Sequence, residues 1–136
     1  MDIKELIKEN DVLAAVELDA ILAGEQSHEQ IHAHLVKYAR YKFLLHDDIF
    51  ESDDIAQLAK RSIVRTLERT GDEATLGDLS KTCAGVSSAT TKHLLLIIAI
   101  KRGLEIDIDP DTVAYSETFD KLASAVKEAL DSKMQQ

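Results

Sequence analysis

Apolar residues recur every three or four positions along most of the chain, and this spacing places them on one face of an α-helix. It predicts a first helix from Asp2 to Gly24, with Gly24 as a natural stop and Asn10 as a candidate break. The apolar positions of this helix are Ile3, Leu6, Ile7, Leu13, Val16, Ala20 and Ile21.

A second helix is predicted to begin at Ser27, because Gln30 follows three residues later in a capping-box pattern. We expect this helix to end within His46 to Asp48. Its apolar stripe consists of Ile31, Leu35, Tyr38, Ala39 and Phe43.

The polar segment Ser52 to Asp54 suits the start of a third helix, since small polar and acidic residues are favoured at helix N-termini. Gly71 is expected to end this helix. Its stripe consists of Ile55, Leu58, Ala59, Ile63 and Leu67. In the loop that follows, Leu76 and Leu79 can anchor a short helical turn or a connecting loop.

The most apolar stretch of the chain, Leu94 to Ile100, belongs to a predicted helix from Ala89 to Arg102. Ser87-Ser88 precedes this helix and Gly103 is expected to close it. A bilayer requires roughly 20 apolar residues in a row, so this shorter stretch is expected to be a core helix.

Leu104 to Asp109 alternates apolar and acidic residues but is short and meets Pro110, so we interpret it as an extended connector that leads to a brief helical turn. A last helix is predicted to begin at Ser116, and the tail Asp131 to Gln136 is expected to fray. The face of this helix consists of Phe119, Leu122, Ala123, Val126, Ala129 and Leu130. The pattern as a whole predicts an all-α protein.

The composition narrows the possible functions. The length of 136 residues fits one domain, and a content of 4% aromatic residues with no Trp predicts an aliphatic core. A net charge of -9 repels phosphate backbones and disfavours a nucleic-acid partner.

The one cysteine, Cys83, excludes an intramolecular disulfide, and Met1 to Lys4 does not begin a secretory signal. We expect a cytoplasmic protein with no membrane segment.

From Leu94 to Leu130 an apolar helix, an extended segment, a proline-containing link and an amphipathic helix follow one another. The residues that mark this order are Gly103-Leu104, Ile106-Asp107-Ile108, Asp109-Pro110-Asp111 and Glu117-Thr118-Phe119. Their order and spacing resemble the second half of an acyl carrier protein, in which a partner-docking helix leads through a hydrophobic and acidic connector to a short third helix and a Thr-initiated fourth. Ile55 to Leu67 would be the first helix of that family, so the resemblance extends over about Asp53 to Leu130.

The resemblance implies an acyl-carrier-like four-helix bundle over residues 51–136, with an N-terminal helical extension, residues 1–50, packed on it. Such proteins hold acyl groups on a 4'-phosphopantetheine arm and deliver them to acyl-transferring enzymes, with no catalysis of their own. We therefore expect a carrier, or a carrier-derived protein that has lost the arm and binds partner proteins.

The family attaches its arm to the serine of an Asp-Ser-Leu motif, which this sequence lacks. The gap-free register puts Thr90 at the position of that serine, with Ser87 and Ser88 just before it. Because the modifying transferase acts on serine, Ser88 is the expected attachment site, with Ser87 and Thr90 as alternatives. A phosphodiester at a helix N-terminus meets free backbone N–H groups. The other interpretation is that Ser87 or Ser88 is simply a helix cap.

The expected docking helix also departs from the family in its charge. It carries Lys92, His93, Lys101 and Arg102, whereas the family usually presents an acidic face. Two of its stripes are apolar, namely Leu94-Ile97-Ile98 and Leu96-Ala99-Ile100. A helix that is apolar on most sides needs covering on most sides, so we expect the N-terminal helices, Asp2 to Asp48, or a second copy of the chain in a homodimer to cover the second stripe.

His28-Glu29-Gln30-Ile31-His32 matches the His-Glu-x-x-His signature, in which two histidines one turn apart bind zinc and the glutamate activates water. A peptidase of this kind also needs a third ligand and usually a sheet edge for its substrate. We expect a solvated helix start here and predict no metal site, although His28, His32 and His34 could take up zinc or nickel adventitiously.

Two further segments resemble functional motifs. Leu44 to Asp48 contains the His-Asp pair of HD phosphohydrolases without a clear set of further ligands, so a polar helix end is expected. Thr75 to Leu79, followed by Gly85 to Thr90, resembles a DNA-binding helix-turn-helix with one extra residue before Gly85. A regulator of that class would gather Lys81, Lys92, Lys101 and Arg102 on one face. Cys83 is expected to be a small buried hydrophobe.

Overall fold

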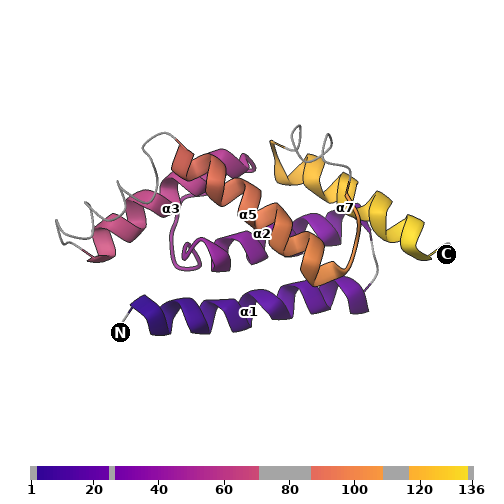
Figure 1. Cartoon of the computed structure of the whole chain (residues 1–136), viewed down its shortest axis with the longest axis horizontal. Helices are drawn as coiled ribbons and strands as arrows, with labels where there is room; N and C mark the ends of the chain where they lie inside the picture. The colour runs from indigo at the N-terminus through magenta and orange to yellow at the C-terminus, as the bar shows by residue number, and fades with distance from the viewer. Residues whose placement is uncertain (1–2, 25–26, 71–86, 109–116, 135–136) are drawn as a thin grey trace.

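The computed structural model of the protein describes residues 3–24, 27–70, 87–108 and 117–134 (Figure 1). Their helices are α1 (Ile3–Ala23), α2 (His28–Lys42), α3 (Ile55–Thr70), α5 (Ser87–Leu104) and α7 (Phe119–Met134). These ranges contain no strand, although Asp54 and Thr118 form an isolated antiparallel bridge. The prediction of an all-α protein is confirmed.

Helix α2 is the central element of the structure. Helices α1 and α7 both pack against α2, while α3 packs against α5 and the end of α5 reaches α1. Helices α3 and α7 begin next to each other and then run toward opposite ends of the molecule (Figure 1). Their starts are joined by two backbone hydrogen bonds, from Ile55 N–H to the Glu117 carbonyl oxygen at 3.0 Å and from Phe119 N–H to the Asp53 carbonyl oxygen at 2.9 Å.

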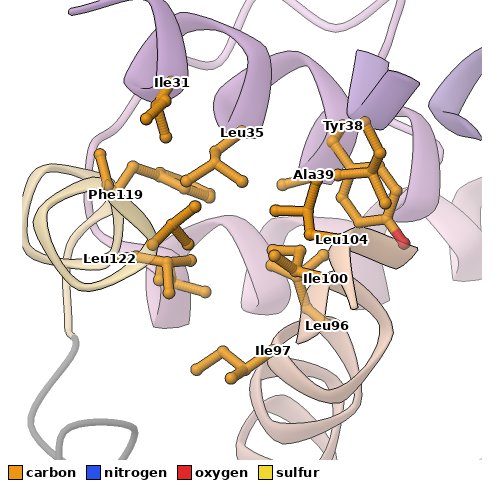
Figure 2. Packing of buried hydrophobic residues seen from close by; sticks show 14 of the residues in the cluster. Ile31, Leu35, Tyr38, Ala39, Leu96, Ile97, Ile100, Leu104, Phe119 and Leu122 are labelled. Atoms are coloured by element: carbon orange, nitrogen blue, oxygen red, sulfur yellow. The ribbon is translucent and has the colours of Figure 1, made fainter. Parts of the chain in front are cut away.

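The core is aliphatic, as the low aromatic content predicts. Figure 2 shows side chains of α2, α5 and α7 that point toward one another in the middle of the core. The labelled residues are Ile31, Leu35, Tyr38, Ala39, Leu96, Ile97, Ile100, Leu104, Phe119 and Leu122. The same cluster includes Leu18 of α1 and Leu58 of α3, so one core joins both sides of residue 50. The division into an extension and a bundle stays a prediction.

Helix α1 continues through Asn10, so the candidate break there is wrong. The Asn10 side-chain amide donates a hydrogen bond to the Leu6 carbonyl oxygen, four residues earlier, at 2.8 Å. This bond keeps a buried polar side chain compatible with an unbroken helix.

Helix α2 begins as predicted but ends earlier. Ser27 is its N-cap, and the Ser27 hydroxyl oxygen accepts a hydrogen bond from the Gln30 backbone N–H at 3.3 Å. The last helical residue is Lys42, because Leu44 adopts a left-handed conformation with φ 58°. The Leu45 N–H then donates to the Arg40 carbonyl oxygen at 2.7 Å, which closes the helix end.

Gly103 does not close α5, which includes Gly103 and ends at Leu104. The left-handed residue is Glu105, with φ 54°. A Cβ atom at position 103 would collide with Leu18 Cδ1 of α1. The glycine therefore permits a close approach of α1 and α5 and is not the helix stop that the sequence predicted.

The connector after α5 is neither helix nor strand over its described residues 106–108. Ile106 and Ile108 are buried on either side of the exposed Asp107. Helix α7 continues to Met134, so the prediction that the chain frays from Asp131 is wrong. Asp131 Oδ2 lies 3.2 Å from Lys127 Nζ, one helical turn earlier on the helix surface. The turn at Leu76 and Leu79, Cys83 and the turn at Pro110 lie outside the described residues.

Candidate functional site

Helix α5 begins at Ser87, two residues before the predicted Ala89, so Ser87, Ser88 and Thr90 all belong to its first turn. That turn contains no acidic residue. An anion at this end would therefore meet the positive pole of the helix without a neighbouring carboxylate in the same turn. The side chains of residues 87–90 lie outside the described part, and the choice between the three hydroxyl groups stays a prediction.

The two apolar stripes of α5 are only partly covered. Leu96, Ile97 and Ile100 are buried, whereas Leu94 and Leu95 are 50% and 57% exposed. Helix α1 reaches the C-terminal end of α5. The expectation that N-terminal helices cover this helix therefore holds for its C-terminal half, while its N-terminal half presents an apolar surface.

A groove of about 280 Å³ lies beside that surface. Its lining residues are Lys42, Phe43, Lys92, Leu95, Leu96 and Ala99. The Lys92 ammonium lies 5.7 Å from the centre of the Phe43 ring, within the range of a cation–π contact. Lys42 Nζ binds Asp11 Oδ1 at 2.9 Å. The groove thus combines apolar walls with two ammonium groups.

The two histidines of the His-Glu-x-x-His pattern serve as links between elements. Their rings stack with centres 6.4 Å apart. His28 Nε2 lies 3.3 Å from Asp120 Oδ1, and His32 Nε2 lies 2.6 Å from Asp53 Oδ1. Because Asp53 Oδ2 also accepts the backbone N–H of Asp120 at 3.1 Å, these contacts tie α2 to the starts of α3 and α7.

His34 has a different neighbour from the other two histidines. Its Nδ1 lies 2.7 Å from Glu17 Oε2 of α1. Within the part of the chain that the structure describes, no three His, Cys, Asp or Glu side chains gather closely enough to hold a metal ion. The histidines are partly exposed and paired with carboxylates, which corrects the expectation of a simply solvated helix start.

A hollow of about 420 Å³ lies beside His32 and the loop before α3. Its polar residues bind the loop itself: Arg40 donates to the carbonyl oxygens of Phe50, at 2.7 Å, and Asp48. Ser52 donates to Gln57 Oε1 at 2.7 Å. We assign these groups a structural role.

Asp48 is the buried anchor of the loop between α2 and α3. Its carboxylate accepts the Phe50 N–H at 2.8 Å and lies 3.0 Å from both Arg61 Nη2 and Arg65 Nε. The hydrogen bond from Phe50 is the main cause that lowers the pKa of Asp48; burial opposes it, and Arg61 and Arg65 add to it. Asp48 therefore belongs to an ion-pair network. The aspartate of the His-Asp pair is its neighbour Asp47, whose Oδ1 lies 3.5 Å from Arg65 Nη2.

The basic residues that a helix-turn-helix regulator would gather are dispersed where they are described. Lys92 lies over Phe43, while Lys101 Nζ lies 3.3 Å from Asp107 Oδ1. Nine residues separate these two lysines, which places them on opposite sides of a helix with 3.6 residues per turn. Lys81 lies outside the described residues.

None of the helices in the described ranges has the length and apolar character needed to cross a membrane. No protein-family model matches the chain, and no curated protein or solved structure matches it either.

Proposed function

We propose that the protein is a non-catalytic, cytoplasmic acyl-carrier-like protein that holds acyl groups on a 4'-phosphopantetheine arm attached to Ser88. The order of apolar and acidic positions from Asp53 to Leu130 supports the family, with residues 51–136 as its bundle and residues 1–50 as an extension. The main supporting observation is that α5 begins at Ser87 and places Ser88 in its first turn.

A helix start suits the chemistry of this attachment. The arm is joined through a phosphodiester, whose negative charge is favoured by the free N–H groups at the beginning of a helix. Lys92 follows Ser88 by four residues, a spacing that puts two positions on the same face of a helix. An arm on Ser88 would thus start on the side of α5 that carries an ammonium group.

The groove lies on the same side of α5. Leu95 and Ala99 follow Ser88 by seven and eleven residues and line the groove together with Phe43. Its apolar walls suit the methylene groups of an acyl thioester, each of which gains about 0.8 kcal/mol when it leaves water. In this proposal the groove shelters part of the cargo between encounters with enzymes.

The proposed partners are acyl-transferring enzymes that dock on the start of α5. This surface presents the exposed Leu94 and Leu95 beside Lys92 instead of an acidic face. A partner would need an apolar patch to cover the two leucines. Helix α5 would then serve both attachment and docking.

Intact-mass measurement after incubation with coenzyme A and a broad-specificity phosphopantetheinyl transferase tests this function. The proposal expects the mass of one arm to be added to the chain and to Ser87→Ala, but not to Ser88→Ala. Addition that is lost in Ser87→Ala or in a Thr90→Ala variant instead would keep the carrier and move its site. No addition to the unaltered chain would contradict the carrier function.

The second candidate is a carrier-derived interaction module without an arm, which the exposed leucines of α5 also favour. It differs from the carrier in one outcome: partner binding would depend on Leu94 and Leu95 while the mass stays unchanged. A helix-turn-helix regulator remains the other alternative, but the dispersal of Lys92 and Lys101 disfavours it.

A further inference from the structure

The groove beside α5 combines a buried apolar floor with a positive charge. Phe43 and Leu96 are 4% and 3% exposed and form its floor, while Leu95 is 57% exposed and forms its rim. The Lys92 ammonium lies 5.7 Å from the centre of the Phe43 ring. A ligand in this groove would therefore meet both an apolar surface and a cation.

The lining residues of α5 follow one face of the helix. Lys92 is followed after three, four and seven residues by Leu95, Leu96 and Ala99, which is the spacing of one helical stripe. A rise of 1.5 Å per residue makes this stripe about 10 Å long. Its charged residue stands at one end, and the rest of the stripe is apolar.

The charges of the groove favour an anionic ligand. None of the described lining residues is acidic, and Lys42 adds a second ammonium group. Asp11 Oδ1 pairs with Lys42 Nζ at 2.9 Å, so Lys92 is the main counter-charge for a ligand. An ammonium group has three N–H donors and can bind a carboxylate while it stays over an aromatic ring.

We propose that this groove binds a free, single-chain anionic amphiphile, namely a medium-chain fatty carboxylate, without a covalent arm. The carboxylate lies at Lys92, and the tail runs along Leu95 and Leu96 toward Ala99. The proposal goes beyond cargo held on an arm and does not rest on attachment at Ser88.

The size of the groove selects this class of ligand. Its volume of about 280 Å³ is close to the lower limit of about 300 Å³ for small-molecule pockets, which suits one alkyl chain better than two. An extended chain advances about 1.2 Å per bond. A stripe of about 10 Å therefore matches a chain of roughly eight to ten carbons.

Calorimetric titration of the full chain with decanoate and with decyltrimethylammonium tests the site, because the two probes share a tail and differ in the charge of the head. A chain of net charge -9 that lacks such a site favours the cation. The proposal expects the opposite order, with a dissociation constant for decanoate below about 1 mM. Decanoate should bind at least about fivefold more tightly than the cation.

Shortening the tail tests the apolar part of the groove. Octanoate should bind up to about fifteenfold more weakly than decanoate, because each buried methylene group contributes about fourfold. Ala99→Leu should weaken both carboxylates, since the larger side chain fills the end of the stripe away from Lys92.

Lys92→Gln tests the counter-charge. It should weaken decanoate binding about fivefold and leave the binding of uncharged decanol unchanged, because glutamine keeps an uncharged polar side chain of similar reach. Lys101→Gln is the matched control, since Lys101 Nζ lies 3.3 Å from Asp107 Oδ1 on another side of α5. Circular dichroism should show equal helix content in all variants.

Three results would overturn the proposal. The first is binding of decyltrimethylammonium as tight as that of decanoate, and the second is an equal loss in Lys92→Gln and Lys101→Gln. The third is binding to phosphatidylglycerol vesicles without binding of monomeric decanoate, which would assign the groove to a membrane surface instead. All titrations use the chain before any arm is attached, so they give a result whether or not Ser88 accepts one.

Discussion

The ion-pair network around Asp48 offers the sharpest stability test. Asp48→Asn removes the negative charge but keeps a side-chain oxygen that can accept the Phe50 N–H. Two guanidinium contacts of 3.0 Å are weakened, with Arg61 and with Arg65. The asparagine therefore isolates the contribution of charge from that of the loop hydrogen bond.

The exposed fractions of the Asp48, Arg61 and Arg65 side chains set the expected loss of stability in Asp48→Asn. Exposed ion pairs contribute about 0–1 kcal/mol, whereas breaking a fully buried pair costs about 3–5 kcal/mol. The Asp48 side chain is 2% exposed, but those of Arg61 and Arg65 are 32% and 26% exposed. We therefore expect Asp48→Asn to lower the free energy of unfolding by about 1–3 kcal/mol, between the two limits.

The pH dependence follows from the lowered pKa of Asp48. Its contribution is fully present above the ordinary carboxyl pKa of 3.8 and is lost as the pH falls through the lower pKa of the folded chain. Urea titrations should show a constant difference between Asp48→Asn and the unaltered chain from about pH 8 to about pH 5, and a shrinking one below about pH 4.

Asp47→Asn is the matched control. The Asp47 side chain is 49% exposed and lies 3.5 Å from Arg65 Nη2, so its loss should cost less than about 1 kcal/mol. Equal losses for the two variants, or an Asp48→Asn difference that persists unchanged in acid, would refute the reasoning.

Two further predictions concern the core. Leu35→Ala should lower the free energy of unfolding by about 2–5 kcal/mol in urea titration, because Leu35 is fully buried in α2. Leu95→Ala on the exposed face of α5 should lower it by less than about 1 kcal/mol. Similar losses for the two variants would contradict the placement of the core. Burial, with a smaller effect of Asp11, raises the pKa of Tyr38 to about 12. The stability that this shift contributes is present below pH 10 and lost as the pH rises through about 12. A spectroscopic titration should therefore show a late-ionising tyrosine signal that Tyr38→Phe removes, and its persistence in that variant would contradict the assignment.

The helix start and the buried face of α2 are predicted correctly because both depend on residues that lie close together in the sequence. The Ser27 cap forms as the spacing to Gln30 indicates, and the apolar stripe of α2 is buried as expected. The ends of α2 and α5 escape prediction, because Leu44 and Glu105 adopt the left-handed conformation that usually indicates glycine. At Gly103 the contact with Leu18 of α1 determines the residue, and no neighbouring residue in the sequence announces that contact.

In the candidate site, too, features set by neighbouring residues are predicted and features set by distant segments are not. The start of α5 is predicted within two residues, because Ser87 is a local helix signal. The groove is not predictable in this way, since it joins Phe43 to Leu95 and Ala99, which follow it by more than 50 residues in the sequence. The carboxylate partners of His28 and His32 also come from distant segments, so the local His-Glu-x-x-His pattern gives no sign of these contacts.

The most direct test of the carrier proposal is fragmentation mass spectrometry of the chain after treatment with coenzyme A and the transferase. The account predicts one phosphopantetheine arm, located on Ser88 in the first turn of α5. A chain that stays unmodified, while an established acyl carrier protein in the same reaction is fully loaded, would contradict it.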